Sequence, residues 1–429
     1  MAGRGAVGAR TAIAVVLAVG GILIWQLGFG GSGLPPRNDA DAAHADADTA
    51  LVAAPTGCSA AVMGGLRRVL GHVYSEGLAG DAAATAKHFI VTSAALSRAV
   101  ERNDPVAARS AAEGVLASGR LTNLRVTRGG RVLANVGPTD AIAPVSGTVP
   151  GAAGKPVGSS TMSVWSDARF REQAQAITDG MLAIQAGDHS SGGFLALAPQ
   201  RLPAQGSITL AGSKYDYTSI PVKVFPSGAQ RIYLLLPHAR TTHLCAGSSE
   251  RTLLHTLERV ANLIYLEEIG PRAAVQIERV QRDPALLRAV ARRDRSAARL
   301  AVDHLLNQHV VRLRILVKGH VLVDVGGPHV LGPRYAPLRL GSSTVGSFVL
   351  SIQDDLGYLL LANRLAGLRV VMHSGGKVVM NSLGPAPPAA PREGSLRYRG
   401  RRYLAFTVHA TAFPSGPLRI DVYAPLPYS

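Results

Sequence analysis

One sequence motif occurs twice in this chain of 429 residues. The stretch "VFPSGAQRIYLLLP" begins at Val224, and "AFPSGPLRIDVYAP" begins at Ala412, 188 residues later. Upstream, "GSITLAGSKY" matches "GSLRYRGRRY", "LTNLRVTRGGRVLANVGP" matches "VVRLRILVKGHVLVDVGGP", and "LSRAVERNDPVAAR" matches "LLRAVARRDRSAAR", in the same order and at nearly the same offset. Ordered matches at one spacing indicate an internal duplication. We predict that the two copies span residues 57–238 and 243–429.

The second copy shows the pattern of elements most clearly. Apolar residues recur every three or four positions from Cys245 to about Gln308, which predicts helices. "RLRILVKGHVLVDVG" alternates on both sides of Lys318-Gly319, as is typical of a β-hairpin. "VGSFVLSI" predicts a strand, and "QDDLGYLLLANRLAG" predicts a short helix capped by Asp354 or a neighbour and ended by Gly367.

Further antiparallel strands follow, and the repeated Pro-Ser-Gly predicts a tight turn between the last two strands of each copy. Helices, two strands, a helix and then more strands predict an α+β fold, in which each copy has one antiparallel sheet covered by helices.

The segment "TAIAVVLAVGGILIWQLG", which begins at Thr11, carries no charge and is long enough to span a bilayer. Arginines precede it and an acidic stretch follows it. The positive-inside rule therefore predicts a cytoplasmic tail (1–10), a single transmembrane anchor (11–29) and a disordered linker (30–56), with the rest of the chain outside the bacterial cell membrane. A cleaved signal peptide is the alternative, and it would export the same residues.

The formal net charge of +17 would suggest nucleic-acid binding in a nuclear or cytosolic protein. Here the charges are scattered and aromatic residues make up only 5% of the chain, so no basic stretch is interleaved with stacking rings. We expect no nucleic-acid partner. A basic exterior that faces anionic lipid or wall polymer explains the charge, and a codon bias toward Arg and Ala is the alternative explanation.

Two cysteines, Cys58 and Cys245, occupy equivalent places, each just before the first helix of a copy. In an exported chain this pattern predicts a disulfide that joins the two helical entries. Free thiols or an intermolecular bond are the alternative.

We predict no metal site, no catalytic site and no cofactor. His304 and His309 are five residues apart, which does not align them on one face of a helix. The chain contains no G-x-S-x-G elbow, no H-E-x-x-H and no P-loop. Helix capping accounts for the adjacent carboxylates Asp354 and Asp355.

Polar residues on strands with apolar opposite faces are the candidate ligand-binding residues. They are Arg314, Asp324, Arg334, Tyr335, Tyr403 and Thr407. A guanidinium fork and a phenol would suit a carboxylate ligand. The alternative is that these residues line the solvent-exposed face of a half-covered sheet, with the arginines lying over apolar neighbours. The second copy is richer in such residues, so we expect the pocket there.

An exported chain with an anchor helix, a long helical entry and this order of strands resembles the Cache (PDC, PAS-like) sensor family. Two copies in tandem are similar to its double-Cache arrangement. The resemblance implies a pocket between sheet and covering loop for a small carboxylate or amino acid, and dimerisation through the helical entries. The chain departs from the family in ending at Ser429, without a cytoplasmic output module, and in lacking the Tyr/Arg/Trp/Asp pattern of the amino-acid-binding members.

The sequence therefore predicts a membrane-anchored extracytoplasmic sensor or binding protein for a small polar solute, which signals through an unidentified partner. The alternative is a cell-envelope interaction protein that has the same fold but no small-molecule pocket. Its basic surface would bind anionic envelope material in a salt-sensitive way. An exported enzyme is a third possibility, for which the chain offers no catalytic constellation.

Overall fold

The computed structural model describes residues 57–186, 189–191, 202–226, 228–306, 310–328 and 330–428, which belong to the unit Thr49–Ser429. The predicted tail, anchor and linker (1–56) lie outside the described residues. Within the described ranges, no helix has the length and apolar character needed to cross a bilayer.

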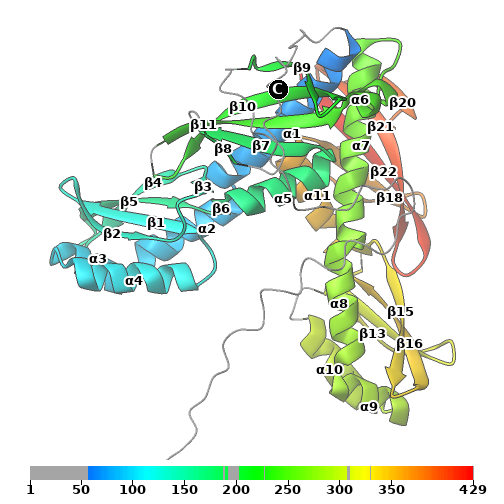
Figure 1. Cartoon of the computed structure of the whole chain (residues 1–429). Coiled ribbons are helices and arrows are strands. Elements are labelled where there is room, and N and C mark those ends of the chain that lie inside the picture. Colours follow the sequence, from blue (N-terminus) through cyan, green and yellow to red (C-terminus); the bar gives the residue numbers. More distant parts are fainter. Residues whose placement is uncertain are drawn as a thin grey trace, which may run out of the picture. The chain divides into compact units, whose positions relative to one another are not determined.

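Two sets of elements follow one another in the same order (Figure 1). The first set comprises α1 (Cys58–Ala79), α2 (Asp81–Thr92), α3 (Ala94–Glu101), α4 (Pro105–Ala117), β1 (Asn123–Arg128), β2 (Arg131–Val136), β3 (Ala141–Ile142), β4 (Val145–Pro150), β5 (Pro156–Ser163), β6 (Trp165–Ser166), α5 (Asp167–Thr178), β7 (Met181–Ala186), β8 (His189–Ser191), β9 (Gln205–Leu210), β10 (Ser213–Val224) and β11 (Gly228–Pro237).

The short helix α6 (His238–His243) leads into the second set. This set comprises α7 (Ser249–Ile269), α8 (Pro271–Arg282), α9 (Pro284–Arg292), α10 (Arg295–Leu306), β12 (Arg312–Val317), β13 (His320–Gly326), β14 (Val330–Leu331), β15 (Arg334–Leu340), β16 (Ser343–Ser351), β17 (Gln353–Asp354), α11 (Asp355–Ala366), β18 (Arg369–Ser374), β19 (Lys377–Asn381), β20 (Glu393–Tyr398), β21 (Arg401–Ala412) and β22 (Gly416–Leu426).

The structure confirms an α+β fold with antiparallel sheets, but the prediction of one sheet in each copy is wrong. Each set forms a four-stranded sheet, β2-β1-β5-β4 or β13-β12-β16-β15, and a seven-stranded sheet, β6-β3-β10-β11-β7-β8 with β9 on β10, or β17-β14-β21-β22-β18-β19 with β20 on β21. The physical reason is that each group of strands has its own apolar face and its own helices to cover that face.

The small sheets are covered by the helices that precede them. In the first set, buried residues of α2, α3 and α4 pack against β1, β2, β4 and β5, with Leu124 and Val126 facing the helices. In the second set, α8, α9 and α10 cover the sheet in the same way, with Leu313 and Ile315 facing inward. Because strand residues alternate between faces, Arg312 and Arg314 point to the opposite side.

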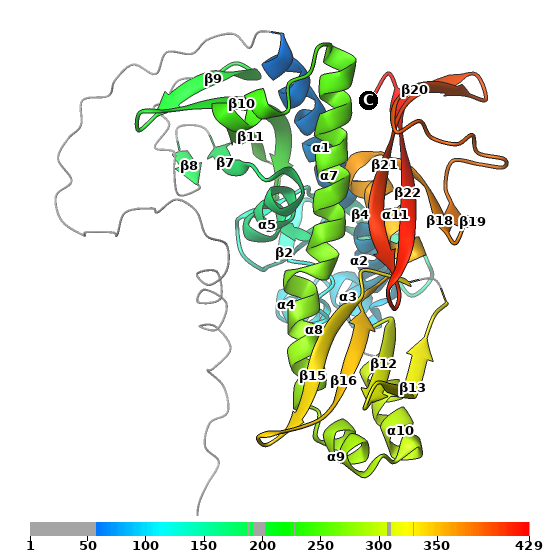
Figure 2. The ribbon, with the colours of Figure 1, turned by 90° about the vertical axis from the view of Figure 1, so that its right-hand side faces the viewer.

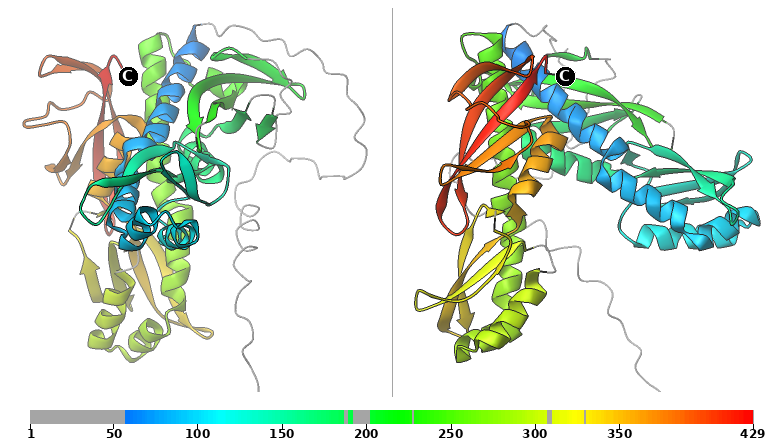
Figure 3. Two further views of the ribbon diagram at one scale, coloured as in Figure 1. Left: turned by 90° about the vertical axis from the view of Figure 1, so that its left-hand side faces the viewer. Right: turned by 180° about the vertical axis from the view of Figure 1, so that it is seen from behind.

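The two large sheets share one core, which contains both long helices. Helix α1 packs against α7 and α11, and α5 packs against α7, so each set contributes to covering the other. Figures 2 and 3 show α1 and α7 side by side, between β10–β11 and β21–β22. One face of each large sheet is therefore buried against the helices, and its other face is available for different contacts.

Several local predictions are confirmed. The Asp354 carboxylate caps α11 by accepting a hydrogen bond from the Gly357 N–H at 2.6 Å, and Gly367 ends this helix with φ 64°, a conformation that glycine adopts without steric strain. Val317 pairs with His320 across the predicted Lys318-Gly319 turn. The Pro-Ser-Gly of the second copy lies in the turn that joins β21 to β22; in the first copy Pro226 and Gly228 lie between β10 and β11 or at the start of β11, and Ser227 lies outside the described residues.

Candidate functional site

A group of charged side chains lies on the outer face of the second large sheet. Strand pairing places Val371, Asp421 and Thr407 in one row across β18, β22 and β21, and His373 beside Arg419 in the next row. Neighbouring residues of β22, such as Ile420 and Val422, point into the shared core. The alternation of side chains along a strand therefore puts these polar groups on the face that the long helices leave free.

Asp421 is the centre of this group, and its side chain is fully buried. Its carboxylate accepts hydrogen bonds from Thr407 Oγ1 at 2.9 Å and from Arg419 Nε and Nη2 at 2.8 and 3.0 Å. His373 Nε2 lies 3.2 Å from Oδ2. A buried charge is tolerated where such partners replace water. We call Asp421, Arg419, His373 and Thr407 the Asp421 cluster.

Arg419 and His373 approach the carboxylate of Asp421 from partly exposed positions. The side chain of Arg419 is 44% exposed and that of His373 is 23% exposed, whereas Asp421 is not exposed at all. The hydrogen bond to Asp421 raises the pKa of Arg419. Burial, and then the charge of Asp421, raise the pKa of Tyr423, so its phenol remains a neutral donor. The cluster thus combines a sheltered carboxylate with a guanidinium and an imidazole whose side chains are partly exposed.

The segment between β19 and β20, residues 382–392, lies over part of the same face, and we call it the covering loop. Four side-chain donors bind its carbonyl groups: Tyr423 Oη reaches Pro388 O at 2.8 Å, Tyr398 Oη reaches Pro385 O at 2.5 Å, Asn381 Nδ2 reaches Gly384 O at 2.6 Å, and Arg419 Nη2 reaches Ala390 O at 3.4 Å. Arg419 therefore connects the covering loop to the buried carboxylate.

A small apolar core fills the space beneath the covering loop. It consists of Val371, Ala390, Tyr403, Ala405 and Tyr423. The rings of Tyr403 and Tyr423 meet edge to face, with centroids 6.4 Å apart. The predicted binding residue Tyr403 thus packs in this core, while the predicted residue Thr407 belongs to the Asp421 cluster.

The first copy has a different lining at the equivalent places. Strand pairing puts Tyr233 where the second copy has Asp421, and Tyr217 where it has Ala405. Both tyrosines are buried with Leu202, and their ring centroids are 6.0 Å apart. Burial, followed by the neighbouring Tyr233, raises the pKa of Tyr217 to about 12, so its phenol is neutral. The charged arrangement is therefore a feature of the second copy.

The predicted residues Arg314 and Asp324 lie on the small sheet of the second copy. Arg312 and Arg314 both bind Asp324, with Nη2–Oδ2 distances of 3.0 and 2.7 Å. Their guanidinium carbons lie 4.7 and 5.5 Å from the ring centroid of Phe413. Burial alone would raise the pKa of Asp324, but the hydrogen bonds from the two arginines outweigh burial and lower it. These charges hold Phe413, a residue of the repeated turn, against the small sheet.

The other two predicted residues are neighbours on β15. Tyr335 is 60% exposed and donates a hydrogen bond to the Pro414 carbonyl, next to Phe413. Arg334 is exposed at the start of the strand. The structure thus brings Arg314, Asp324 and Tyr335 to one turn, and it places Tyr403 and Thr407 on a different sheet.

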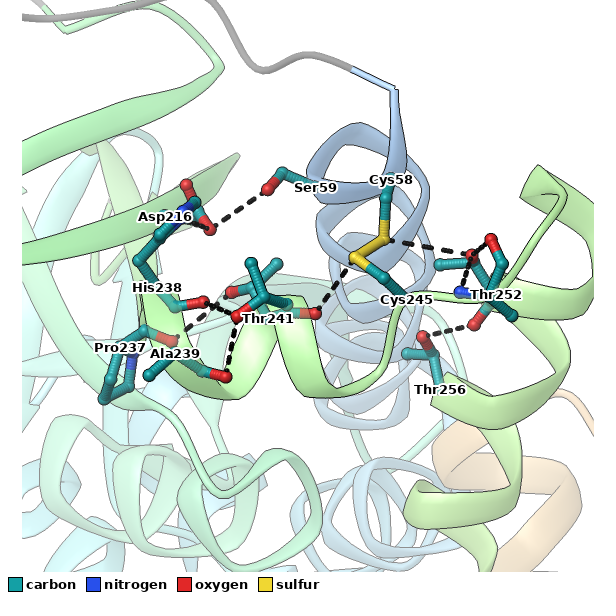
Figure 4. Close-up of a disulfide and its surroundings, with 12 residues drawn as sticks. Cys58, Ser59, Asp216, Pro237, His238, Ala239, Thr241, Cys245, Thr252 and Thr256 are labelled. Carbon is teal, nitrogen blue, oxygen red and sulfur yellow. Dashed lines mark hydrogen bonds and ion pairs between the residues drawn. A yellow bond between two sulfur atoms is a disulfide. The ribbon is translucent and has the colours of Figure 1, made fainter.

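The disulfide between Cys58 and Cys245 connects the start of α1 to the segment that precedes α7 (Figure 4). The two Cα atoms are 5.6 Å apart. Thr252 Oγ1 lies 3.9 Å from Cys58 Sγ, and Cys245 Sγ lies 3.4 Å from the Thr241 carbonyl oxygen. Both long helices of the shared core are therefore linked covalently at the end where they begin.

A second buried carboxylate, Asp216 on β10, lies near the disulfide (Figure 4). It accepts hydrogen bonds from Ser59 Oγ at 3.2 Å and Ser207 Oγ at 2.5 Å, and His238 Nδ1 lies 2.8 Å away. Burial would raise its pKa, but the hydrogen bonds from Ser207, His238 and Thr241 outweigh burial and lower it. Asp216 thus ties the first large sheet to α1 and α6 as an ionised group.

Replacing Asp216 with Asn should lower the free energy of unfolding by about 1–3 kcal/mol at pH 7, because buried hydroxyl donors lose a charged acceptor. A pKa lowered by folding gives stability that is complete above the unfolded value, near 3.9, and is lost as pH falls through the folded value. The wild-type chain should therefore lose more stability than Asp216→Asn below about pH 4. Urea unfolding from pH 7 to pH 2 measures this difference, with the surface variant Asp303→Asn as the control. If the free energy of unfolding fell equally for Asp216→Asn and wild type between pH 4 and pH 2, the claim that Asp216 is ionised in the folded chain would be contradicted.

Three grooves on the described surface have volumes of about 810, 760 and 510 Å³. The first lies along α3 and α4, the second beside Tyr335 and Lys318, and the third between α1 and α11. None of the three includes a member of the Asp421 cluster. Among the described residues, no group of three or more His, Cys, Asp or Glu side chains could hold a metal ion. His309, one of the two histidines weighed as metal ligands, lies outside these residues.

Sequence reasoning missed Asp421, Arg419 and His373. A signal for the first was present in the duplication, because the aligned copies read "RIYLL" and "RIDVY". The second copy therefore has a carboxylate where the first has an aromatic ring, within strands that are otherwise alike. A charge at a position that the other copy fills with a buried side chain points to a special environment.

No family model matches the chain, and no curated protein is significantly similar to it. Among solved structures, it is similar to an extracellular ligand binding receptor from Desulfohalobium retbaense, with 13% identity over 51% of this chain and a TM-score of 0.25. The match spans 46% of that receptor, less than half of its length.

The chain is also similar to the ligand-binding domains of two chemoreceptors. For CtaA of Pseudomonas fluorescens, in complex with L-alanine, the identity is 12% over 40% of this chain and 92% of the domain, with a TM-score of 0.24. For Tlp3 of Campylobacter jejuni, in complex with 4-methylisoleucine, the identity is 12% over 43% of this chain and 94% of the domain, with a TM-score of 0.23. At TM-scores this far below 0.5, the likeness identifies neither a ligand nor an activity for this chain.

Proposed function

We propose that the chain is a membrane-anchored extracytoplasmic binding protein of the Cache-like sensor class, and that it passes ligand binding to a separate partner. Its ligand is a small solute with an ammonium group, such as an amino acid, bound at the Asp421 cluster of the second copy. One observation carries the proposal. A fully buried carboxylate at the centre of a strand is bound by Arg419 and lies beside His373, and the side chains of both partners are partly exposed to solvent.

A ligand ammonium can take the place of the Arg419 guanidinium at Asp421. An ammonium has three donors, which suit the two carboxylate oxygens. Arg419 is two residues away on the same strand and is 44% exposed, so it can turn toward a ligand carboxylate and bind it with two parallel hydrogen bonds. The number of opposite charges around Asp421 stays constant during this exchange.

Movement of the covering loop would report the exchange. Arg419 donates to the loop carbonyl of Ala390 as well as to Asp421, so its displacement removes one of the four side-chain hydrogen bonds to carbonyl groups of this loop. A partner protein that binds the covering loop in only one of its two positions would then bind more or less tightly when the ligand is present. In the first copy Tyr233 occupies the place of Asp421, so we propose one ligand site in each chain.

A panel of amino acids, amines, carboxylates and sugars should contain a ligand that raises the thermal midpoint of the detergent-solubilised full chain. A ligand at 100 times its Kd stabilises the folded state by about 2.7 kcal/mol, which corresponds to a shift of a few degrees. Asp421→Asn should weaken binding roughly 30-fold or more, because the ligand cation loses its buried counter-charge. Calorimetric titration measures Kd for each variant.

Tyr233→Phe is the matched control, since it alters the equivalent position of the first copy. It should leave Kd unchanged. Unfolding of each variant without ligand separates lost binding from lost folding. Equal Kd values for wild type and Asp421→Asn would place the site elsewhere, and a panel without any hit on a folded chain would overturn the small-ligand proposal.

The second candidate is a cell-envelope interaction protein, and one observation favours it. Buried tyrosines fill the space on the outer face of both large sheets: Tyr217 and Tyr233 in the first, Tyr403 and Tyr423 in the second. A sheet filled in this way needs no ligand to complete it. This function predicts binding to anionic envelope material that weakens with salt, and no response to the small-molecule panel.

A further inference from the structure

The hairpin formed by β20 and β21 ends in a concentrated group of positive charges. Its tip, residues 397–402, reads "RYRGRR", and all four arginines are exposed. Arg397 pairs directly with Arg402 across the strands. Like charges that face each other destabilise a hairpin. Arg402 has one acidic partner, Glu250 at the start of α7, at 2.8 Å. The tip therefore carries more positive charge than its described surroundings compensate.

The first copy shows that the fold does not need these arginines. The equivalent tip between β9 and β10, residues 209–214, reads "TLAGSK". Its turn residues Ala211 and Gly212 have φ values of 48° and 74°, and their counterparts Arg399 and Gly400 have 50° and 76°. The two turns thus share one backbone conformation and differ in charge. The backbone conformation of the turn therefore does not account for the arginines of the second copy.

The arginine-rich tip lies at the end of the structure where the described chain begins. Arg402 contacts the first turn of α7, and the disulfide joins the segment before α7 to Cys58, the first residue of α1. Figures 1 and 3 show the β20–β21 hairpin at the same end as the beginning of α1. The predicted linker, residues 30–56, connects this end to the predicted anchor. These 27 residues set the length of chain between the predicted anchor and this end.

From this placement we propose that the arginine-rich tip binds phosphate groups of anionic lipids in the membrane from which the chain emerges. This inference rests on the proposed membrane anchoring. A guanidinium binds phosphate oxygens with two parallel hydrogen bonds, and several arginines on one hairpin can engage several headgroups. Each basic residue near an anionic surface contributes about a fivefold preference for it. Binding would hold the second large sheet, with its Asp421 cluster, at a defined position above the bilayer.

The test uses the full chain in nanodiscs of phosphatidylcholine, with or without about one third phosphatidylglycerol. A donor dye on Ser395→Cys, an exposed position of β20, reports energy transfer to an acceptor on lipid headgroups. We expect stronger transfer in the anionic discs, and loss of the difference in 0.5 M salt, where the screening length falls to about 4 Å.

The matched variant replaces each arginine of the tip with the first copy's residue and keeps Tyr398, with Arg397→Thr, Arg399→Ala, Arg401→Ser and Arg402→Lys. Because three charges are lost, the preference for anionic discs should fall roughly 100-fold, and the difference in energy transfer should disappear. The control removes three exposed arginines from α9 and α10, the helices that cover the small sheet of the second copy. The changes are Arg288→Gln, Arg292→Gln and Arg295→Gln. It should keep the response of the wild-type chain.

The possible failures can be told apart. Equal transfer in both kinds of disc would overturn the lipid proposal and leave the anchor intact. A tip-dependent response to soluble inorganic phosphate or polyphosphate, without one to anionic lipid, would also overturn it. A chain that does not insert into discs at all would overturn the anchoring and this inference together, whereas the amino-acid titrations test the Asp421 site independently of both.

Discussion

Removing the disulfide by Cys58→Ser with Cys245→Ser should lower the free energy of unfolding by about 5 kcal/mol. The bond joins residues separated by 187 positions, and a cross-link across so long a loop restricts the unfolded chain strongly. It also links the first residue of α1 to the segment before α7, and these two helices form the centre of the shared core. Guanidinium unfolding of the wild-type and double-variant chains under oxidising conditions measures the difference.

Reduction of the wild-type chain provides the control for this prediction. The reduced chain should match the stability of the double variant, and the double variant should not respond to reductant. A difference of less than 1 kcal/mol between oxidised wild type and double variant would contradict the entropic role of the bond. It would mean that α1 and α7 already associate in the unfolded chain, so that the cross-link removes little freedom.

Local structure could be predicted from this sequence because its determinants are local. Asp354 and Gly367 mark the ends of α11 through the hydrogen-bonding and φ preferences of single residues, and Lys318-Gly319 marks a turn for the same reason. The division of each copy into two sheets could not be predicted in this way. Alternation of apolar and polar residues shows that a strand has a buried face, but it does not show which helix covers that face.

The same limit applies to the candidate site. The alternating pattern correctly separates Arg314 from its apolar neighbours, but Phe413, which both arginines cover, lies 99 residues further along the chain, in the turn between two strands of the large sheet. Asp421 has the pattern of a solvent-facing strand residue. Its burial results from Arg419, Thr407 and neighbouring side chains on three strands, and no single window of sequence contains them.

Phe413→Ala should uncouple the small sheet of the second copy from its large sheet. The Phe413 ring is 9% exposed and packs with Val330 and Val349 beneath two guanidinium groups. Loss of a buried Phe ring lowers the free energy of unfolding by about 3–5 kcal/mol. Each arginine also loses a cation–π contact, worth about 0.5–1 kcal/mol at an exposed site. Arg312 and Arg314 would then neutralise Asp324 without holding the turn.

Hydrogen exchange measured by mass spectrometry distinguishes uncoupling from general destabilisation. In Phe413→Ala, amides of β12, β13, β15 and β16 should exchange faster than in wild type, while those of the first copy keep their protection. Phe413→Leu should have a smaller effect because it leaves a shorter gap under the guanidinium groups. Phe225→Ala is the matched control in the first copy, where Asn123 and Asn135 stand in place of Arg312 and Asp324. A uniform increase in exchange over both copies would show that the turn supports the whole fold. Arg314 and Asp324 would then not serve specifically to connect the small sheet of the second copy to its large sheet.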